Sequence, residues 1–511
     1  MDRLTGFASG LDINQMVRDL MNAERQPLIK IQQAKFETEF KVAEYRSVNR
    51  QFQQFRESTF DGIMRGANML AKSVTSTNES AITATAGSAA PAGSYTISDV
   101  TLAEAATSFS NGELGDEVNA AGAISEWATS GVGADGSIEF SMTTFNANGE
   151  AVTEDFSFSE NDSLNTVLTA INNSDLGVQA FFDPFSNRVS MQRTETGEFN
   201  PNGNGEIIFG SLDDDGIPVE SDFLTEALNL DSAQDQGARN ATFTINGLAT
   251  ERTSNTFSVN GMQVTLNENI EGPVRLSVDN NVDRAFDTIM AFVDEYNEMI
   301  GGLNDKVSEE YFRDFPPLTD EQRSELSESE IEKWEEKSNS GLLRNDSIIN
   351  GALNNMRQDV YTPVAGDGTF TQITQIGITT TSNFQDRGRL EVNEDELRAA
   401  LAEDPEAVFA LFAGDGATPA EQGIARRLRN TLQGSITDIG NRAGRSDSAT
   451  PQTYTLGREL LQTDDRISNF ERRLQQIENR YWAQFTAMER AISQSNAQAE
   501  SLFASLMGPQ Q

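Results

Sequence analysis

The chain lacks two of the residue types on which catalysis most often relies. Its 511 residues include no cysteine and no histidine. Without cysteine there can be no disulfide bridge, thiolate nucleophile or zinc–thiolate site, and without histidine the commonest general base and transition-metal ligand is missing. We therefore expect a protein that is not an enzyme and that holds no cofactor and no metal.

Long apolar runs are also missing. No stretch of about 18 apolar residues occurs, so the sequence predicts no transmembrane helix and no membrane insertion. Asp2, Asp12, Arg18 and Asp19 interrupt the first twenty residues, which excludes a typical cleavable Sec signal peptide. If the protein leaves the cell, we expect it to use another route.

Basic residues are scarce relative to acidic ones. The chain has 38 Lys and Arg against 79 Asp and Glu, a net charge of −41, which argues against binding to nucleic acid or to an anionic membrane. The two ends of the chain are nearly balanced in charge, and the acidic excess lies between them. Ends with little self-repulsion suit close packing in an assembly, whereas an acidic middle suits a hydrated outer surface.

So many carboxylates leave an acidic enzyme as an alternative, since a glycosidase needs only two of them at a suitable separation. Nothing in the sequence singles out such a pair. Residues 213–216 (DDDG) resemble a calcium loop, but the spacing of possible ligands is wrong, so we expect a turn there.

The most informative pattern is an apolar residue at every third or fourth position from Leu456 to Leu506. It predicts one amphipathic helix of about 75 Å at 1.5 Å per residue, which is too long for one compact domain to cover. Thr463 and Ser495 interrupt the stripe, and two successive steps of four around Tyr481 form a stutter. Such a helix needs a partner, so an assembly role is favoured.

The N-terminal region offers that partner. Asp12 is a candidate N-cap, with Gln15 at the capping-box position and Leu11 able to contact Met16. Pro27 is expected to end or kink this first helix. A second helix is predicted from about residue 28 to 70, and we expect its apolar stripe, from residue 28 to 55, to pack on the C-terminal helix.

The middle of the chain alternates polar and apolar residues, as strands do. Strands are predicted at residues 81–85, 93–100, 137–143, 155–158, 177–182, 188–191, 241–246 and 256–266, with a short helix starting near Ser163. The dipeptides Asn246-Gly247 and Asn260-Gly261 strongly predict hairpin turns. Beyond them we predict a helix over 282–303, a polar helical hairpin over 319–338 with capping boxes at Thr319 and Ser327, and strands and a helix within 371–413, including a turn at Arg387-Gly388.

These elements define a multidomain α+β fold. Long N- and C-terminal helices pair as a coiled-coil leg, and the β-rich middle domains are nested, one inserted in another. The predicted segments are N-terminal helices at 1–75, a β-rich domain at 76–106 plus 241–278, an inserted variable α+β domain at 107–240, an α+β domain packing on the leg at 279–450, and the C-terminal coiled-coil helix at 451–511.

Several stretches resemble the flagellar hook-associated protein 2 family, the filament-capping proteins of bacterial flagella. The matching stretches are residues 10–13 and 20–28, 92–97 with 102–103, 292–297, 317–322, 334–337, 341–343, 377–380, 388–390 and 397–412. Their order extends over about three quarters of the chain, and residues 107–240 match least.

The resemblance implies a filament cap: a homo-oligomeric ring at the filament tip, a pentamer by family default, that assists folding and insertion of exported flagellin and so supports filament elongation and motility. Implied partners are copies of the same chain, flagellin, the hook–filament junction proteins and a flagellar export chaperone. The implied location is extracellular, at the tip of the flagellum, after type III export without a cleaved signal peptide.

Residues of the two terminal stripes are the candidate contacts with flagellin or with other copies. They are Leu20, Tyr45, Val48, Phe52, Phe55, Ile467, Phe470, Leu474, Ile477, Tyr481, Phe485, Met488, Ile492 and Leu502. Two alternatives stay open. One is a hook–filament junction protein or a flagellin-like structural protein, which also end in paired helices. The other, from a different class, is a surface adhesin that binds a glycan or a host protein through residues 107–240.

Overall fold

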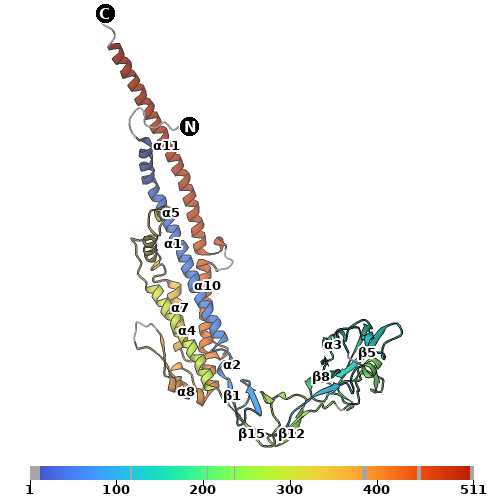
Figure 1. Cartoon of the computed structure of the whole chain (residues 1–511). Coiled ribbons are helices and arrows are strands. Elements are labelled where there is room, and N and C mark those ends of the chain that lie inside the picture. Colours follow the sequence, from blue (N-terminus) through green and yellow to red (C-terminus); the bar gives the residue numbers. More distant parts are fainter. Residues whose placement is uncertain are drawn as a thin grey trace. The chain divides into compact units, whose positions relative to one another are not determined.

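The computed structural model describes residues 12–506 with gaps at 116–117, 204, 235, 367, 383–387 and 446–449, and only the backbone of 504–506. Contacts divide the chain into a helical unit, Met1–Met69 with Val282–Gln511, and a strand unit, Leu70–Asn281 (Figure 1). The predicted α+β class, with long terminal helices and a β-rich middle, is confirmed. The finer division into five segments stays a prediction.

The helical unit contains two helices much longer than the rest, α1 (Ile13–Asp61) and α11 (Thr455–Leu506). The other elements are α2 (Gly66–Met69), α4 (Val282–Ser308), α5 (Asp320–Ser324), α6 (Glu328–Asn339), α7 (Ser347–Tyr361), β16 (Ile378–Thr380), β17 (Leu390–Val392), α8 (Glu394–Glu403), α9 (Pro405–Ala413) and α10 (Ile424–Ala443). The predicted turn at Arg387-Gly388 lies partly outside the described residues.

Helix α1 continues through Pro27, so the expectation that the helix ends there is wrong, while a kink at Pro27 stays a prediction. The side chain of Asp12 caps its start by accepting the Gln15 N–H at 3.0 Å. The predicted partner contact of Leu11 lies outside the described residues. Pro27 lacks the N–H that would bond the Ala23 carbonyl, but both residues are exposed. Water can therefore satisfy that carbonyl, and the helix continues.

The main core of the helical unit gathers around α4. Buried side chains from α1, α4, α7, α8, α9 and α10 form one cluster, which also includes Leu456 at the start of α11. Aromatic rings join its parts: Phe292 of α4 stacks on Phe55 of α1 at 5.8 Å and meets Phe412 of α9 edge-on at 5.8 Å. Half of α1 is therefore core rather than leg.

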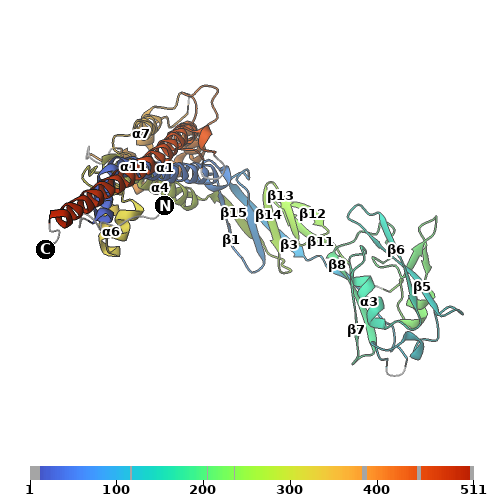
Figure 2. The same cartoon turned by 90° about the horizontal axis from the view of Figure 1, so that it is seen from above.

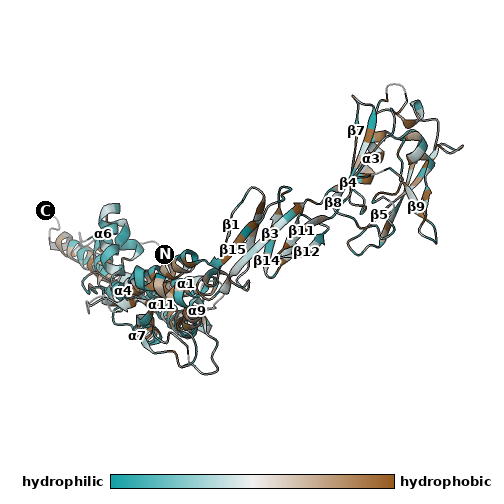
Figure 3. Cartoon of the chain, turned by 90° about the horizontal axis from the view of Figure 1, so that it is seen from below, coloured by the Kyte–Doolittle hydropathy of each residue, from teal (hydrophilic) through white to brown (hydrophobic). Residues whose placement is uncertain are grey.

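Helices α5 and α6 form the predicted polar hairpin. Both predicted capping boxes, at Thr319 with Gln322 and at Ser327 with Glu330, are present. Helix α6 is largely hydrophilic along its length (Figure 3). A polar contact joins the hairpin to α1: Gln33 of α1 donates to the side chain of Gln322 of α5 at 3.3 Å.

The strand unit begins with a five-stranded antiparallel sheet in the order β1-β15-β3-β11-β12 and a three-stranded sheet in the order β13-β14-β2 (Figure 2). These strands are β1 (Lys72–Ser76), β2 (Ile82–Ala86), β3 (Gly93–Thr101), β11 (Ala241–Ile245), β12 (Leu248–Arg252), β13 (Thr256–Val259), β14 (Met262–Leu266) and β15 (Val274–Asn280). Their inward side chains share one buried cluster.

The two predicted hairpin turns are confirmed. Asn246 and Gly247 join β11 to β12 with φ of 49° and 84°, and Asn260 and Gly261 join β13 to β14 with φ of 49° and 79°. Two successive residues with positive φ are the requirement of a type I′ turn, which Asn-Gly meets at little cost. The predicted strand 256–266 is thus a hairpin of its own, in a different sheet from β11.

The chain between β3 and β11 builds a second cluster of buried side chains. Its elements are β4 (Ala105–Phe109), β5 (Ser137–Phe145), β6 (Ala151–Ser159), α3 (Leu164–Asn172), β7 (Val178–Asp183), β8 (Arg188–Thr196), β9 (Gly210–Leu212) and β10 (Pro218–Glu220). Helix α3 starts directly after Ser163, as predicted, and the Ser163 side chain caps it by accepting the Thr166 N–H. The Asp213 carboxylate accepts the N–H groups of Asp215 and Ile217, so residues 213–216 form the expected turn.

Candidate assembly surface

An apolar seam joins the two longest helices. Buried side chains from α1 and α11 meet in a cluster separate from the main core, and further α11 side chains pack partly buried against it. The buried members are Ile13, Val17, Met21, Leu28, Leu474 and Ile477, and the partly buried ones are Ile467, Phe470, Tyr481, Trp482 and Phe485. We call this helix pair the leg.

Polar contacts fix the direction of the leg. Lys35 of α1 forms an ion pair with Asp464 of α11 at 2.8 Å, and Tyr481 OH donates to Glu24 at 3.0 Å. Residue numbers rise along α1 as they fall along α11, so the helices are antiparallel. The hydrogen bond that the Lys35 ammonium donates to Asp464 raises the pKa of Lys35 above its ordinary 10.5, against a smaller opposing effect of burial.

Helix α11 continues beyond the start of α1. Given the pairing of Glu24 with Tyr481, Ile13 lies near residue 492, so roughly a dozen residues of α11 extend past it. Figure 1 shows this extension at the C-terminal end of α11. It carries two exposed apolar side chains, Leu502 at 60% and Phe503 at 69% exposure.

The structure places four of the predicted contact residues elsewhere. Tyr45, Val48, Phe52 and Phe55 are buried in the main core of the helical unit, at most 4% exposed. They lie in the same core as residues of α4, α7, α8, α9 and α10, and Leu456 of α11 also belongs to it. The expected pairing of the 28–55 stripe with the C-terminal helix is therefore confirmed only in part, at Leu28 and at the Lys35–Asp464 ion pair. A second molecule cannot reach these four side chains without unfolding the core.

The other predicted residues follow the leg. Leu474 and Ile477 are buried in the seam, Ile467, Phe470, Tyr481 and Phe485 border it, and Met488 and Ile492 are half-buried further along α11. Leu20 is 38% exposed on α1 and Leu502 is exposed near the end of α11. Of the set, Leu20 and Leu502 are the most accessible to another molecule.

Several contributors to the leg escaped the sequence reasoning, beginning with Ile13, Val17 and Met21 of α1, which lie outside the stripe expected to pair with the C-terminal helix. Trp482 borders the seam because the stutter around Tyr481 rotates the apolar stripe around the helix. Its position three residues before Phe485 could have indicated that both side chains lie on the same face. Phe503 lies next to a predicted stripe position. The contact of Gln33 with Gln322 of the polar hairpin, at 3.3 Å, links residues 289 apart, and no local pattern signals it.

The part of the chain that the structure describes contains no candidate metal site. Within it, no cluster of three or more Asp and Glu side chains is arranged to hold a metal ion. In the same residues, no helix is long and apolar enough to cross a bilayer. Among the described residues, the features that remain are a helical leg with an exposed apolar end and a strand unit with two buried clusters.

Comparison with known proteins identifies the family. A sequence model of the flagellar hook-associated protein 2 N-terminus matches residues 9–106, and one of its C-terminus matches residues 238–497. The flagellar hook-associated protein 2 of Halalkalibacterium halodurans is 36% identical over 98% of this chain and 99% of its own length. The chain belongs to the flagellar hook-associated protein 2 family, as the resemblance predicted.

More distant relatives agree. The flagellar hook-associated protein 2 of Escherichia coli K12 is 25% identical over 97% of this chain and 96% of its own length. A crystal structure of the flagellar cap protein from Escherichia coli covers 82% of this chain and 99% of its own, with a TM-score of 0.56 at 22% sequence identity. That last likeness shows a shared fold.

Proposed function

We propose that this protein caps the bacterial flagellar filament and assists folding and insertion of flagellin at its tip, so that the filament elongates and the cell swims. The observation that carries the proposal is the leg. In this member of the hook-associated protein 2 family, the antiparallel pair of α1 and α11 ends in exposed apolar side chains of α11. Such an end suits contact with helices of neighbouring subunits or of flagellin. This role is structural, and it requires no catalytic residue.

The partners follow from that role. Copies of the same chain form a ring, with five subunits as the family default, and flagellin and the hook–filament junction proteins contact it. Before secretion an export chaperone binds the chain. The protein acts outside the cell, at the flagellar tip, after passing unfolded through the type III export channel. A chain without cysteine suits that passage, because no disulfide forms before export is complete.

The test uses the exposed end of α11 rather than the seam. In a host that lacks its own cap gene, Phe503→Asp should reduce swimming and filament length and raise the amount of unpolymerised flagellin in the medium. Replacing Leu474 and Ile477 with Asp would answer a different question, because these buried side chains hold the leg itself together.

Phe185→Asp is the matched control. Phe185 is 98% exposed in the strand unit, so the substitution introduces the same charge at another exposed phenylalanine that does not belong to the leg. The control should swim normally. Normal filaments with Phe503→Asp, or equal loss with both variants, would count against contact through the end of α11.

An adhesive role of residues 107–240 is the second candidate function. Phe109 and Phe181 both pair with Ser190, from opposite edges of the sheet β4-β8-β7. They are 45% and 59% exposed, so two aromatic rings flank a small residue on one solvated face. A Phe181→Ser protein tested with the unaltered protein on a glycan array would decide: no glycan bound by the unaltered protein, or equal binding by both, removes this candidate.

A further inference from the structure

The leg has two flanks, one on each side of its apolar seam, and on α11 they carry opposite charges. From Ile467 to Tyr481 the seam residues follow steps of three and four, so they occupy positions a and d of a heptad repeat, with Ile467 at position a. Positions e and g then border the seam on opposite sides. Position e holds the carboxylates Asp464, Glu471 and Glu478, and position g holds the arginines Arg466, Arg473 and Arg480. We call these three arginines the arginine row.

Helix α1 offers cations to the acidic flank but no carboxylate to the arginine row. Because the two helices are antiparallel, position e of one lies beside position e of the other, and g lies beside g. With Met21 at position a of α1, position e includes Arg25, and position g holds Leu20, Pro27 and Ala34, which have no charge. The arginines of the row are exposed, and none of them forms an ion pair with a carboxylate of the described residues. Their charge is therefore available to a second molecule.

The polar hairpin of α5 and α6 lies on the other side of the leg. Arg25, at position e of α1, forms an ion pair with Glu321 of α5 at 3.9 Å. Helix α6 is tied to α5 by an ion pair between Arg323 and Glu335. Figure 1 likewise shows α1 between α5 and α11. The hairpin and the arginine row are thus exposed on opposite sides of the helix pair.

Helix α6 presents a row of carboxylates to solvent. Glu328, Glu332 and Glu336 follow one another in steps of four, which places them on one face, and all three are exposed. We call them the carboxylate row. Like charges at this spacing repel each other along a helix, so a cationic surface laid on this face would relieve the repulsion. The surroundings add to the negative charge, because residues 309–338 include 11 acidic residues and four basic ones.

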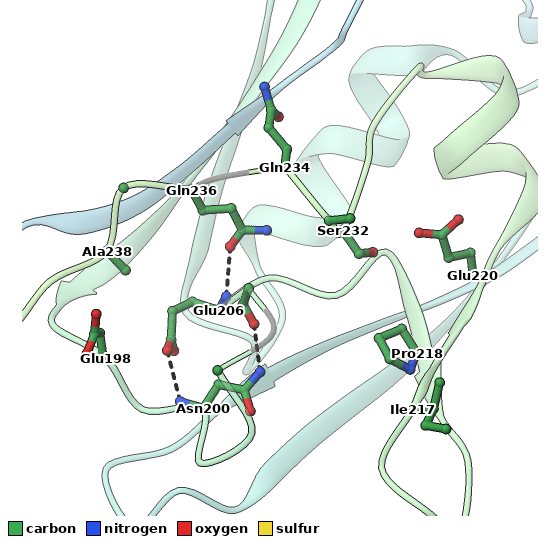
Figure 4. Close-up of a pocket in the computed structure, with 14 residues that line it drawn as sticks. Glu198, Asn200, Glu206, Ile217, Pro218, Glu220, Ser232, Gln234, Gln236 and Ala238 are labelled. Carbon is green, nitrogen blue, oxygen red and sulfur yellow. Dashed lines mark hydrogen bonds between the residues drawn. The ribbon is translucent and has the colours of Figure 1, made fainter.

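Other carboxylates fit the arginine row less well. Figure 4 shows a pocket of the strand unit that Glu198, Glu206 and Glu220 line. The Glu206 carboxylate already accepts the N–H groups of Phe199 and Asn200, both at 2.8 Å, and the residue is 4% exposed. A helix flank is a straight ridge that cannot enter a pocket. The carboxylate row is itself straight and exposed, so it is the better match.

The two rows also lie at the same height along the leg. Contacts at Lys35 and at Glu24 of α1 set which residues of α1 and α11 are level. The hairpin contacts α1 at Arg25 and Gln33, between these two residues. On α11, Arg473 lies between the partners of the same two residues. A closed ring relates neighbours by rotation alone, so with legs side by side a surface and its complement must be level.

We propose that in the ring the arginine row of one copy binds the carboxylate row of the next copy. The contact is heterologous, because each copy uses its arginines on one side of the leg and its carboxylates on the other. Leu20, 38% exposed on the same flank as the arginine row, is covered in the same contact. The inference rests on the proposed function for the existence of the ring, and it adds which surfaces join its subunits.

The test measures self-association of the full-length protein by sedimentation velocity. Arg473→Glu should weaken association by about 10- to 100-fold, because it replaces attraction by repulsion at the centre of the row. Arg473 is the better choice than Arg480, which also lies over the ring of Tyr481 at 5.6 Å. Adding Glu332→Arg and Glu336→Arg to the same chain should restore association, because the two surfaces then match again with their signs exchanged. Association of the unaltered protein should fall as the NaCl concentration rises.

Arg472→Glu is the matched control. Arg472 is the neighbour of Arg473 and is equally charged and exposed, but it occupies position f, which points away from the seam and from both flanks. The substitution changes net charge and helix composition in the same way, so it should leave association unchanged. Equal thermal melts of the two variants, followed by circular dichroism, would show that the leg stays folded in both.

The absence of cysteine allows a second measurement on the same contact. A chain with Arg473→Cys and Glu332→Cys, treated with a short bismaleimide, should give a ladder of linked copies on a denaturing gel. A chain with Arg472→Cys and Glu332→Cys should stay mostly single. This comparison needs no change of charge sign, so it tests the contact even if Arg473→Glu fails to fold.

Three results would overturn the proposal. They are equal association of the Arg473→Glu and Arg472→Glu proteins, no recovery when the α6 substitutions are added, and an unaltered protein that stays monomeric at low salt. Failure of filament capping reads out differently, as an unaltered protein that does not restore swimming to a host without its own cap gene. Rings that form equally well in both variants would remove this contact and leave capping in place.

Discussion

Truncation of one seam residue should loosen the leg without disturbing the rest of the helical unit. Leu474 is 6% exposed and belongs to the α1–α11 cluster, which is separate from the main core. Leu474→Ala removes three carbons from the seam, worth about 0.8 kcal/mol each, so the loss is about 2–3 kcal/mol. The low end of the range for buried leucines applies because a two-helix seam is open along its sides.

That loss has a measurable kinetic signature. At about 1.4 kcal/mol per tenfold change, the population of the opened leg should rise about 30- to 150-fold. Amide hydrogen exchange should accelerate by that factor between Ile13 and Leu28 of α1 and around Leu474 of α11. Amides of α4 and α7, in the main core, should keep their rates.

Phe503→Ala supplies the control and separates two functions of α11. Phe503 is 69% exposed, so its truncation should change exchange in the leg by less than a factor of about two, while filament capping falls. Unchanged exchange of α1 in Leu474→Ala would refute the reasoning, because it would mean that the seam does not hold α1 against α11.

Two further predictions concern other parts of the fold. The pKa of Lys35 is raised in the folded protein, so its ion pair with Asp464 stabilises fully below pH 10.5 and is lost as the pH rises through the raised value. Because both side chains are partly exposed, the stability difference between the unaltered protein and Lys35→Gln should be at most about 1 kcal/mol, and it should vanish at high pH in thermal melts. Gly247→Ala should destabilise the β11–β12 hairpin by about 1 kcal/mol in urea unfolding, because φ at this residue is 84°. Gly272→Ala is the control, since an added Cβ has as much room there and φ is ordinary, and it should leave the free energy of unfolding unchanged. Equal effects of the two substitutions would contradict the turn argument.

The sequence predicted best what local chemistry decides. The Asp12 cap, the capping boxes of the polar hairpin and the two Asn-Gly turns each involve groups within a few residues of one another. Their hydrogen bonds form whatever the rest of the chain does, so a short pattern suffices to find them.

The sequence was least informative about which helices pack against each other within the chain. The stripe containing Tyr45 and Phe52 was expected to face α11, but periodicity identifies the buried face of a helix and says nothing of what covers it. Helix α10 was missed although Leu428, Leu432, Ile436 and Ile439 follow helical spacing on its buried face. Trp482 was missed because the stutter changes which residues face the seam.

The way the chain enters and leaves the strand unit has a consequence for how such proteins diversify. Strands β1 and β15 pair from Lys72↔Asn280 to Ser76↔Leu276, and further on Glu104 bridges Arg239. At both places the outgoing and returning strands are already hydrogen-bonded neighbours. The length of chain between them can then change at little extra cost in loop closure, because the ends of the loop are held together. The segment beyond each of these pairs can therefore be replaced by a different segment, in evolution or by design. The pairing of α1 with α11 is then unaffected.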